Sequence, residues 1–573
     1  MRGKQGMISD FNQQVCLKVG VTAHRDLNYT DTRQVQHQVR EFFQRLQSQF
    51  PTLPIVLVNP LAEGGDMLVA KIALDMGLQL EAPLPMPIEL YEQDFDDQSL
   101  AEFRSMLAHC ETYELPLAPG NTLDNIRDHG EARNRQYAQL GMYIASHTHM
   151  LLALWDGRES SEPGGTASVV HYQLQDVMPG MPSPEQARNL LAEKENDLVY
   201  HIHCPRDESE QQRVGRWLSS TSEYPGLDMP RRYRAAFDHM EVFKRDANRH
   251  AGLITESRET LLADEEMSAD SGLTAIDSVY RVADRLAIHY SQLVVRELVL
   301  THTLAALMGV SFITYSEYQE FAILLPAFLV FFFTAWFINM IANKLSWHRK
   351  YLDYRALAEG LRVQFYWCLA DVEGFNGTAF TYDNLMQKQD VELVWIRHMM
   401  RSVSTAGRAH TRKLGNGMAL AVEHWVGGAW ADAGQLAYYH NAGEARASKL
   451  KRDALFGQIT LWAGISIALY LLFMAAELDD TSTNVLFILM GLLPLLAGIR
   501  ETYAYKKADK ELTKQYLFMF RTFSLASEKL EQSDDPATRG AILRALGETC
   551  LEEHAEWILL HRERPLETAG LAV

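Results

Sequence analysis

Four runs of uncharged, mostly apolar residues constrain the fold of this chain most strongly. They lie at residues 298–315, 321–342, 455–476 and 485–499 of 573. A helix needs about 20 apolar residues to cross a bilayer, and the shortest run can extend back through Thr481. One such run alone could be a buried core helix. Two closely spaced pairs instead predict two membrane hairpins, which a mean hydropathy of −0.17 for the whole chain conceals.

Positive charge flanks the outer ends of both hairpins and is missing from their short loops. The flanking residues are Lys344, Arg349, Lys350, Arg355, Lys449, Lys451, Arg452, Arg500, Lys506 and Lys507. Because Lys and Arg stay on the cytoplasmic side of a membrane, we expect both termini and the segment between the hairpins to be cytoplasmic. Residues 1–19 contain no apolar signal-peptide core.

The net charge and the cysteines limit the classes of partner. A formal charge of −19 argues against a protein that coats nucleic acid, since phosphate binding needs a basic surface. The five cysteines are scattered without a CxxC pair, which favours a reducing compartment over a disulfide scaffold or a zinc cluster. We therefore expect no nucleic-acid partner, no metal and no resident cofactor.

Residues 14–206 alternate short apolar segments with amphipathic ones. The expected strands lie at 15–22, 54–60, 78–87, 149–157 and 196–206. This alternation predicts an α/β fold with a doubly wound parallel sheet. Ligands of such sheets bind at the carboxyl ends of the strands, so the loops at those ends are the candidate site.

Three glycine-containing loops follow the first, second and fourth of these expected strands. They contain Gly20 to Thr22, Gly64-Gly65 and Gly164-Gly165. Glycine lets backbone amides approach a phosphate, and a helix N-terminus favours negative charge. The loops therefore predict a nucleotide-type ligand, although plain turns also use glycine. Neither GxGxxG nor a P-loop motif is present.

Two segments carry a resemblance to a known family. PLAEGGDMLVAKIAL (60–74) and LLALWDGRESSEPGGTASVV (151–170) resemble the SLOG superfamily of nucleotide sensors and hydrolases. The resemblance implies a Rossmann-like domain whose loops hold a cyclic nucleotide or an NAD-derived ligand, with Arg25 and Arg135 nearest its phosphates. The residues expected to bind are Gly20, Thr22, His24, Arg25, Glu63, Gly64, Gly65, Asp66, Arg135, Asp156, Gly164, Gly165 and Thr166.

The same loops depart from the hydrolase branch of that superfamily. Its motif resembles PGGxGTxxE, whereas this chain has PGGTASVVHYQL, without the glutamate that supports glycosidic-bond cleavage. Glu63 is the acid/base candidate if the protein is an enzyme, but such residues as often bind ribose hydroxyls. Sensing is favoured over catalysis.

The remainder of the chain is expected to be helical. Residues 348–372 and 546–567 resemble the segments that flank the hairpin of SLATT domains, which are membrane effectors found beside SLOG sensors. Those domains usually have one hairpin, whereas this chain has two. The expected parts are a SLOG-like domain (14–206), a helical coupling segment (207–295), a first hairpin (296–343), a cytoplasmic helical segment (344–453), a second hairpin (454–500) and a C-terminal helical region (501–573).

Together these resemblances imply an effector in the bacterial inner membrane that acts in antiphage defence. Its expected partners are a nucleotide messenger, the lipid bilayer, further copies of itself and a genomically linked messenger synthase. The polar residues expected to line a pore are His302, Asn339 and Gln458, which could equally form hydrogen bonds between helices. Two alternatives stay open: a membrane-anchored SLOG enzyme that hydrolyses NAD or a nucleotide N-glycosidic bond, and a structural membrane scaffold.

Overall fold

The computed structural model divides the chain into two compact units, each containing sequence-distant segments. The α/β unit comprises Met1–Val282 and Leu357–Met418, and the helical unit comprises Ala283–Ala356 and Ala419–Val573. The structure describes residues 11–27, 29–160, 162–181, 197–206, 213–255, 260–262, 271–372, 393–404, 416–427, 434–474 and 477–562. The last five residues of the SLATT-like segment 546–567 lie outside the described residues.

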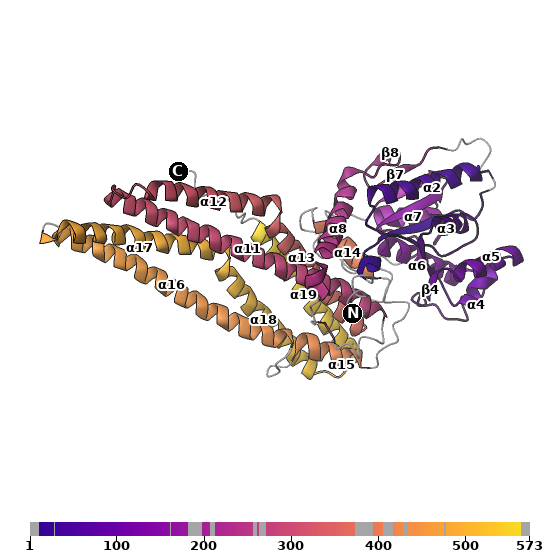
Figure 1. Cartoon of the computed structure of the whole chain (residues 1–573). Coiled ribbons are helices and arrows are strands. Elements are labelled where there is room, and N and C mark those ends of the chain that lie inside the picture. The colour runs from indigo at the N-terminus through magenta and orange to yellow at the C-terminus, as the bar shows by residue number, and fades with distance from the viewer. Residues whose placement is uncertain are drawn as a thin grey trace. The chain divides into compact units, whose positions relative to one another are not determined.

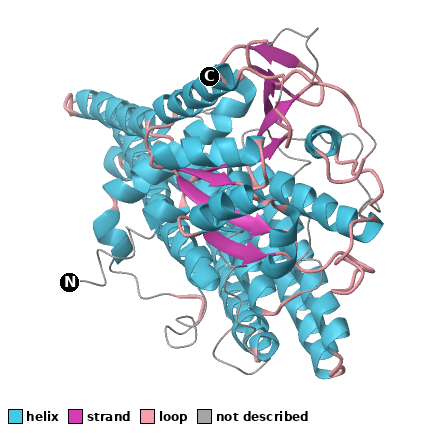
Figure 2. Ribbon diagram, turned by 90° about the vertical axis from the view of Figure 1, so that its right-hand side faces the viewer, coloured by secondary structure: helices cyan, strands magenta, loops and turns pink. Residues whose placement is uncertain are grey.

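The α/β unit contains one eight-stranded sheet in the order β4-β3-β2-β1-β5-β6-β7-β8. Strands are magenta among the cyan helices in Figure 2. Its strands are β1 (Leu17–Ala23), β2 (Ile55–Val58), β3 (Gln79–Leu84), β4 (Glu111–Glu114), β5 (Met150–Trp155), β6 (Val199–His203), β7 (Arg216–Leu218) and β8 (Glu223–Pro225). Neighbours from β4 to β6 are parallel, and β7 and β8 are antiparallel additions at one edge. A mostly parallel sheet is therefore confirmed.

The helices connect these strands and form nearly all of the helical unit (Figure 1). They are α2 (Thr32–Gln49), α3 (Gly65–Asp75), α4 (Ile88–Tyr91), α5 (Asp97–Leu107), α6 (Glu131–His147), α7 (Thr166–Gln175), α8 (Arg231–Arg249), α9 (Ala251–Thr255), α11 (Ser271–Glu317), α12 (Leu324–Lys344), α13 (Trp347–Leu369), α14 (Val394–Ser404), α15 (Gly417–Ala421), α16 (Gln435–Met474), α17 (Asp480–Lys506), α18 (Asp509–Glu531) and α19 (Pro536–Arg562), with a 3-10 turn η1 (Glu92–Asp94) and a π-helical turn η3 (Val422–Val426).

The central strands are buried on both faces, as their mostly apolar sequences require. All seven residues of β1 are buried, and Leu151 and Ala153 of β5 belong to the core that α6 and α7 complete. Gly20 lies inside β1, where a Cβ atom would be 2.6 Å from Ile144 and 2.8 Å from the Thr148 hydroxyl. A close approach of α6 to β1 therefore accounts for this glycine.

Part of the predicted helical coupling segment (207–295) is wrong, because residues 216–225 form the hairpin of β7 and β8. Trp217 explains this pairing: it is fully buried, and its ring lies 5.0 Å from that of Tyr200 on β6. The Ser219 hydroxyl donates a hydrogen bond to the Ser222 carbonyl and tightens the turn. One buried aromatic residue and a serine-rich turn thus extend the sheet.

Helix α14, from the segment between the two hairpins, is buried throughout within the α/β unit. The Arg401 guanidinium donates a hydrogen bond of 2.9 Å to the Ser146 carbonyl near the end of α6. The Ser402 hydroxyl donates one of 3.1 Å to the Cys16 carbonyl, just before β1. Because an unpaired buried guanidinium would be costly, these bonds fix α14 against the sheet and α6.

Four helices are long and apolar enough to cross a membrane, namely those at Gly272–Glu317, Leu324–Lys344, Gln435–Met474 and Asp480–Lys506. None of the apolar stretch of the fourth is buried, which argues against a core helix. Small residues bring these helices together: a Cβ atom on Gly464 of α16 would lie 2.9 Å from the Pro494 ring of α17. Gly309 of α11 similarly accommodates Leu495, as is common between membrane helices.

Candidate ligand-binding site

The order in which strands are added to the sheet reverses at β1. The chain runs outward from β1 through β2 and β3 to β4, then returns to form β5 on the other side of β1. Open parallel sheets bind ligands in the crevice outside such a switch point, at the carboxyl ends of the strands. The loops after β1, β2 and β5 meet at this edge. The loop after β1 contains His24 and Arg25, the loop after β2 contains Glu63 and Gly64, and the loop after β5 contains Asp156 and Gly164-Gly165.

Gly64 packs the loop after β2 closely against the loop after β1. Its φ of +88° lies in the region that favours glycine, and a Cβ atom would lie 2.6 Å from the carbonyl carbon of Arg25 and nearer still to its oxygen. The amide of the next residue, Gly65, donates a hydrogen bond of 3.0 Å to the His24 carbonyl. The N-terminus of α3 is therefore fixed beside the end of β1.

Tyr137 of α6 joins this pair of loops to the loop after β5. The Arg25 guanidinium lies 5.8 Å from the centre of the Tyr137 ring. Gly164, with a φ of +79°, packs on the same residue, since a Cβ atom there would lie 2.8 Å from both the Tyr137 Cβ and the Ala138 amide nitrogen. The loops after β1, β2 and β5 thus converge around Arg25 and Tyr137.

A buried polar cluster holds Tyr137 in place. Its hydroxyl donates a hydrogen bond to the Asp94 carboxylate, and Arg133 forms an ion pair of 2.9 Å with that carboxylate. Burial and the charge of Asp94 raise the pKa of the Tyr137 hydroxyl, which therefore remains a donor. Arg133 also donates a hydrogen bond of 2.8 Å to the Leu90 carbonyl, so α4 and α6 are joined behind the site.

Asp66 in the first turn of α3 is buried at this edge. Its Oδ1 atom has no hydrogen-bond partner among the described residues. Burial raises the pKa of Asp66 well above the usual range, although the positive charge of Arg25 opposes this effect. Glu63, three residues earlier, is half-buried. The edge therefore combines the Arg25 cation with two carboxyl groups.

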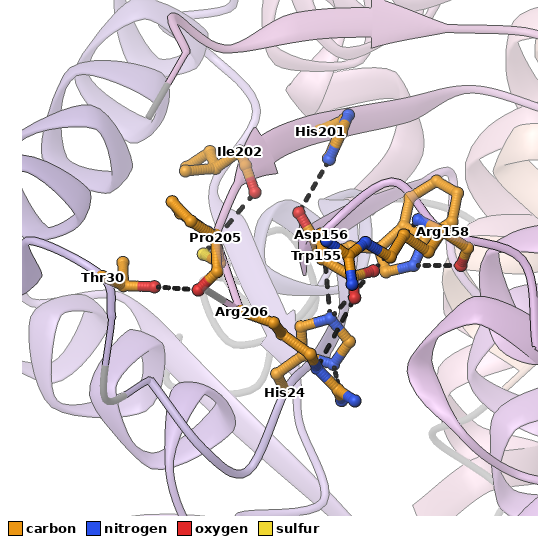
Figure 3. A network of polar contacts seen from close by, with 10 residues as sticks. His24, Thr30, Trp155, Asp156, Arg158, His201, Ile202, Pro205 and Arg206 are labelled. Carbon is orange, nitrogen blue, oxygen red and sulfur yellow. Dashed lines mark hydrogen bonds and ion pairs between the residues drawn. The ribbon is translucent and has the colours of Figure 1, made fainter. Parts of the chain in front are cut away.

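A second polar network lies where β1, β5 and β6 end (Figure 3). Arg206 donates from Nη2 to the His24 Nδ1 atom at 3.0 Å, and its Nε lies 3.5 Å from the Asp156 carboxylate. The Asp156 amide donates a hydrogen bond of 3.0 Å to the His24 Nε2 atom, which also lies 3.3 Å from Asp156 Oδ1. Burial and the charge of Arg206 lower the pKa of His24, so the imidazole is neutral at pH 7.

The edge presents cations and one helix N-terminus to a ligand. Arg25 is exposed, and the side chain of Arg206 is 54% exposed. Gly165 is the N-cap of α7 and supplies no side-chain acceptor for the first-turn amides, whereas the Gly65 and Met67 amides of α3 already donate to the His24 and Ala62 carbonyls. Within the described residues, no group of three or more His, Cys, Asp or Glu side chains is placed to hold a metal.

Some predicted residues lie apart from this convergence. β1 extends to Ala23, so Gly20 and Thr22 lie within the strand and not in the loop after it. Arg135 points to a different partner from Arg25, since it donates hydrogen bonds of 3.3 and 3.0 Å to Asn121. Thr166 is the first residue of α7, directly after the Gly164-Gly165 pair.

Sequence reasoning missed the residues that support the site from other elements. Tyr137 and Asp94 come from α6 and from η1, and no local motif marks them. Arg206 carried a usable signal, because it is the first cation after a buried strand. A cavity of about 230 Å³ beyond the β6 end, lined by His201, His203 and residues 213–216 and 225–226, was also not anticipated.

The three residues predicted to line a pore occupy different environments in the helical unit. The Nδ1 atom of His302 donates a hydrogen bond of 2.8 Å to the Leu298 carbonyl, and the His302 ring lies 5.5 Å from that of Tyr503. Asn339 is half-buried and Gln458 is exposed. Their role in a pore stays a prediction, as does hydrogen bonding between helices.

The fold and the site together define a two-part protein: an α/β unit whose edge presents cations to a ligand, continuous in sequence with four helices that can cross a membrane. In comparisons with known proteins, no family model matches the chain, and no curated protein or solved structure matches it either.

Proposed function

We propose that this protein is an effector of the bacterial inner membrane that senses a nucleotide-derived messenger through a Rossmann-like, SLOG-type α/β unit. Messenger binding then gates or disrupts the bilayer through a SLATT-like membrane unit, acting as a homo-oligomer in antiphage defence. The observation that carries the proposal is the convergence of the loops after β1, β2 and β5, the last two with paired glycines, around Arg25 and Tyr137, in a chain with four candidate spans.

The chemistry of this edge supports a phosphate-bearing ligand. Arg25 offers a planar set of donors that matches phosphate oxygens. The glycine N-cap of α7 leaves its first-turn amides without a side-chain acceptor, and helix N-termini stabilise negative charge. Tyr137 supplies an aromatic ring beside Arg25, against which a nucleobase could stack.

A physical route leads from this edge toward the segment between the hairpins. Tyr137 lies in the second turn of α6, and Ser146 near the end of the same helix accepts the hydrogen bond from Arg401 of α14. A ligand that moves α6 must therefore change the packing of α14. The ligand shifts the equilibrium only if it binds one arrangement more tightly than the other.

Nucleotide binding to the purified full-length protein tests the proposal directly. Cyclic nucleotides, ADP-ribose and NAD serve as probes, and mass spectrometry of the purified protein identifies any retained ligand. Arg25→Ala should weaken binding at least tenfold, because one charge-assisted contact contributes about 1.5–3 kcal/mol. Arg40→Ala is the matched control, because Arg40 is exposed on α2 and pairs with Asp75. Equal binding by both variants would overturn the proposal.

The enzymatic alternative rests on Asp66 and Glu63. A carboxylic acid with a raised pKa can protonate a leaving group, and burial raises the pKa of Asp66. Base release from NAD or a nucleoside monophosphate, abolished by Glu63→Gln or Asp66→Asn without loss of ligand binding, would favour a hydrolase over a sensor.

A further inference from the structure

A cavity of about 320 Å³ lies in the helical unit between α16 and the junction of α17 with α18. Its walls are partly apolar and partly basic. The lining residues are Ala442, Ala445, Arg446, Lys449, Leu450, Lys507 and Asp509. Three cations and one carboxylate give this lining a net charge of about two positive units at neutral pH.

The single lining carboxylate does not neutralise these cations. Asp509 lies 3.8 Å from the Lys507 Nζ atom and 4.0 Å from Arg446 Nη1, both beyond hydrogen-bond distance. Lys449 lies within hydrogen-bonding reach of Lys507, so two like charges are held together. Burial lowers the pKa of Lys507, the charge of Asp509 opposes this effect, and the charges of Lys449 and Arg446 lower the pKa further. A bound anion would relieve this repulsion.

The arginine of the cavity is already held in place. The Arg446 guanidinium lies 4.8 Å from the centre of the Tyr516 ring of α18, and a cation over an aromatic face is attracted to it. The backbone at Ala508 has a φ of +53°, which turns the chain sharply between α17 and α18. This turn presents Lys507 and Asp509 to the same cavity.

The cavity lies at the depth expected for lipid headgroups. Leu450 precedes Leu455, the start of the third apolar run, by five residues or about 7.5 Å of helix. Leu455 and Phe456 are 57% and 58% exposed, as expected for side chains that face lipid. Lys507 lies eight residues, or about 12 Å of helix, beyond Ile499, where the fourth apolar run ends. The headgroup layer on each side of a bilayer is about 5–8 Å thick, which matches the spacing of Leu450, and the long Lys507 side chain can reach back toward this layer.

We propose that this cavity binds the phosphate group of an acidic phospholipid. Arg446, Lys449 and Lys507 would contact the phosphate oxygens, and Leu450 with the neighbouring apolar helix surface would contact the start of the acyl chains. A free phosphate shares the same ionic contacts but gains nothing from the apolar wall. The inference requires only that α16 and α17 lie in a membrane, so it is independent of ligand binding by the sheet.

Lipid binding to the detergent-solubilised full-length protein tests this site. The probes are phosphatidylglycerol, phosphatidylcholine with the same acyl chains, and inorganic phosphate, with affinities measured by native mass spectrometry and by the shift of the thermal midpoint. The double variant K449Q/K507Q should bind phosphatidylglycerol about 30-fold more weakly, since each lysine near an acidic lipid contributes about a factor of five.

Two further variants make the result specific to the cavity. K451Q/R452Q removes two exposed charges from the same helix turn without touching the lining, and it should change phosphatidylglycerol affinity less than twofold. D509N removes the competing carboxylate and should strengthen binding about fivefold, which a merely misfolded variant would not do.

Three outcomes would overturn the assignment. Equal losses in K449Q/K507Q and K451Q/R452Q would show a diffuse surface effect. Equal affinity for phosphatidylcholine would show that only the acyl chains bind. Inorganic phosphate that raises the thermal midpoint as much as phosphatidylglycerol, at equal concentration, would assign the cavity to a soluble anion.

Discussion

Gly64→Ala is the sharpest test of the way the candidate site is assembled. A φ of +88° costs an alanine about 1–2 kcal/mol relative to glycine. The new Cβ atom also overlaps the Arg25 carbonyl group, which is backbone and cannot rotate away, so the loop after β1 must shift. Such overpacking costs about 1–3 kcal/mol. The variant should therefore lose about 2–5 kcal/mol of local stability.

Gly77→Ala is a matched control at the other end of the same helix. Gly77 has a φ of +73°, and a Cβ atom there would meet no atom within 4 Å. This variant should lose only the first contribution, about 1–2 kcal/mol. The difference between the two variants, about 1–3 kcal/mol, isolates the close contact between Gly64 and Arg25.

Native-state hydrogen exchange of the full-length protein measures both losses, because it reports opening free energies segment by segment. Gly64→Ala should lower protection in β1 and in the first turn of α3, and it should weaken nucleotide binding. Gly77→Ala should affect only the end of α3 and leave nucleotide binding unchanged. Equal or smaller losses in Gly64→Ala would refute the packing of this loop against Arg25.

Three other predictions follow from buried contacts. Burial lowers the pKa of His149 to about 3, so below its ordinary value near 6.5 the unfolded chain binds a proton that the folded chain does not. Unfolding midpoints should fall as pH drops from 6.5, and His149→Gln should flatten that fall; an unchanged slope would contradict this account. Arg401→Met should raise hydrogen exchange in α14 by leaving the Ser146 carbonyl unpaired, a cost of about 1–3 kcal/mol, and unchanged exchange would argue against it. Gly464→Val should lower the thermal midpoint by several degrees because it meets the Pro494 ring, whereas Gly498→Val, which faces open space, should not; equal midpoints would refute the packing of α16 on α17.

The sequence pattern predicts the elements that are buried or apolar and misses those that are neither. β2 and β5 have continuous apolar sequences, and β1 and β6 are buried along their whole length although they contain Lys18, His201 and His203. β4 (Glu111–Glu114) is a four-residue edge strand with three exposed residues, so no alternation marks it. The spans were predictable because lipid demands length and hydropathy. α17 extends well beyond the fourth apolar run, since a helix continues through polar residues that leave the bilayer.

The candidate site was predictable only where the local backbone conformation or a close contact requires glycine. Gly64 and Gly164 adopt positive φ angles and pack against backbone, and such requirements leave glycine as a sequence signal. Tyr137 and Arg206 instead reach the site from α6 and from the end of β6, and tertiary packing alone brings them there. Arg135 lies two residues from Tyr137 on the helix and therefore faces a different neighbour, Asn121.

The course of the chain gives a physical basis for coupling ligand binding to the membrane spans. The division between the two units falls three times inside a helix: within α11, α13 and α15. In the α/β unit, Arg362 of α13 donates a hydrogen bond of 2.7 Å to the Tyr280 hydroxyl of α11. A helix transmits a displacement along its axis better than a loop does, because each turn is hydrogen-bonded to the next. Helix α11 contains the first candidate span, and α13 directly follows the second. A ligand-driven change of packing at the contact between Arg362 and Tyr280 would therefore act on helices at both ends of the first hairpin.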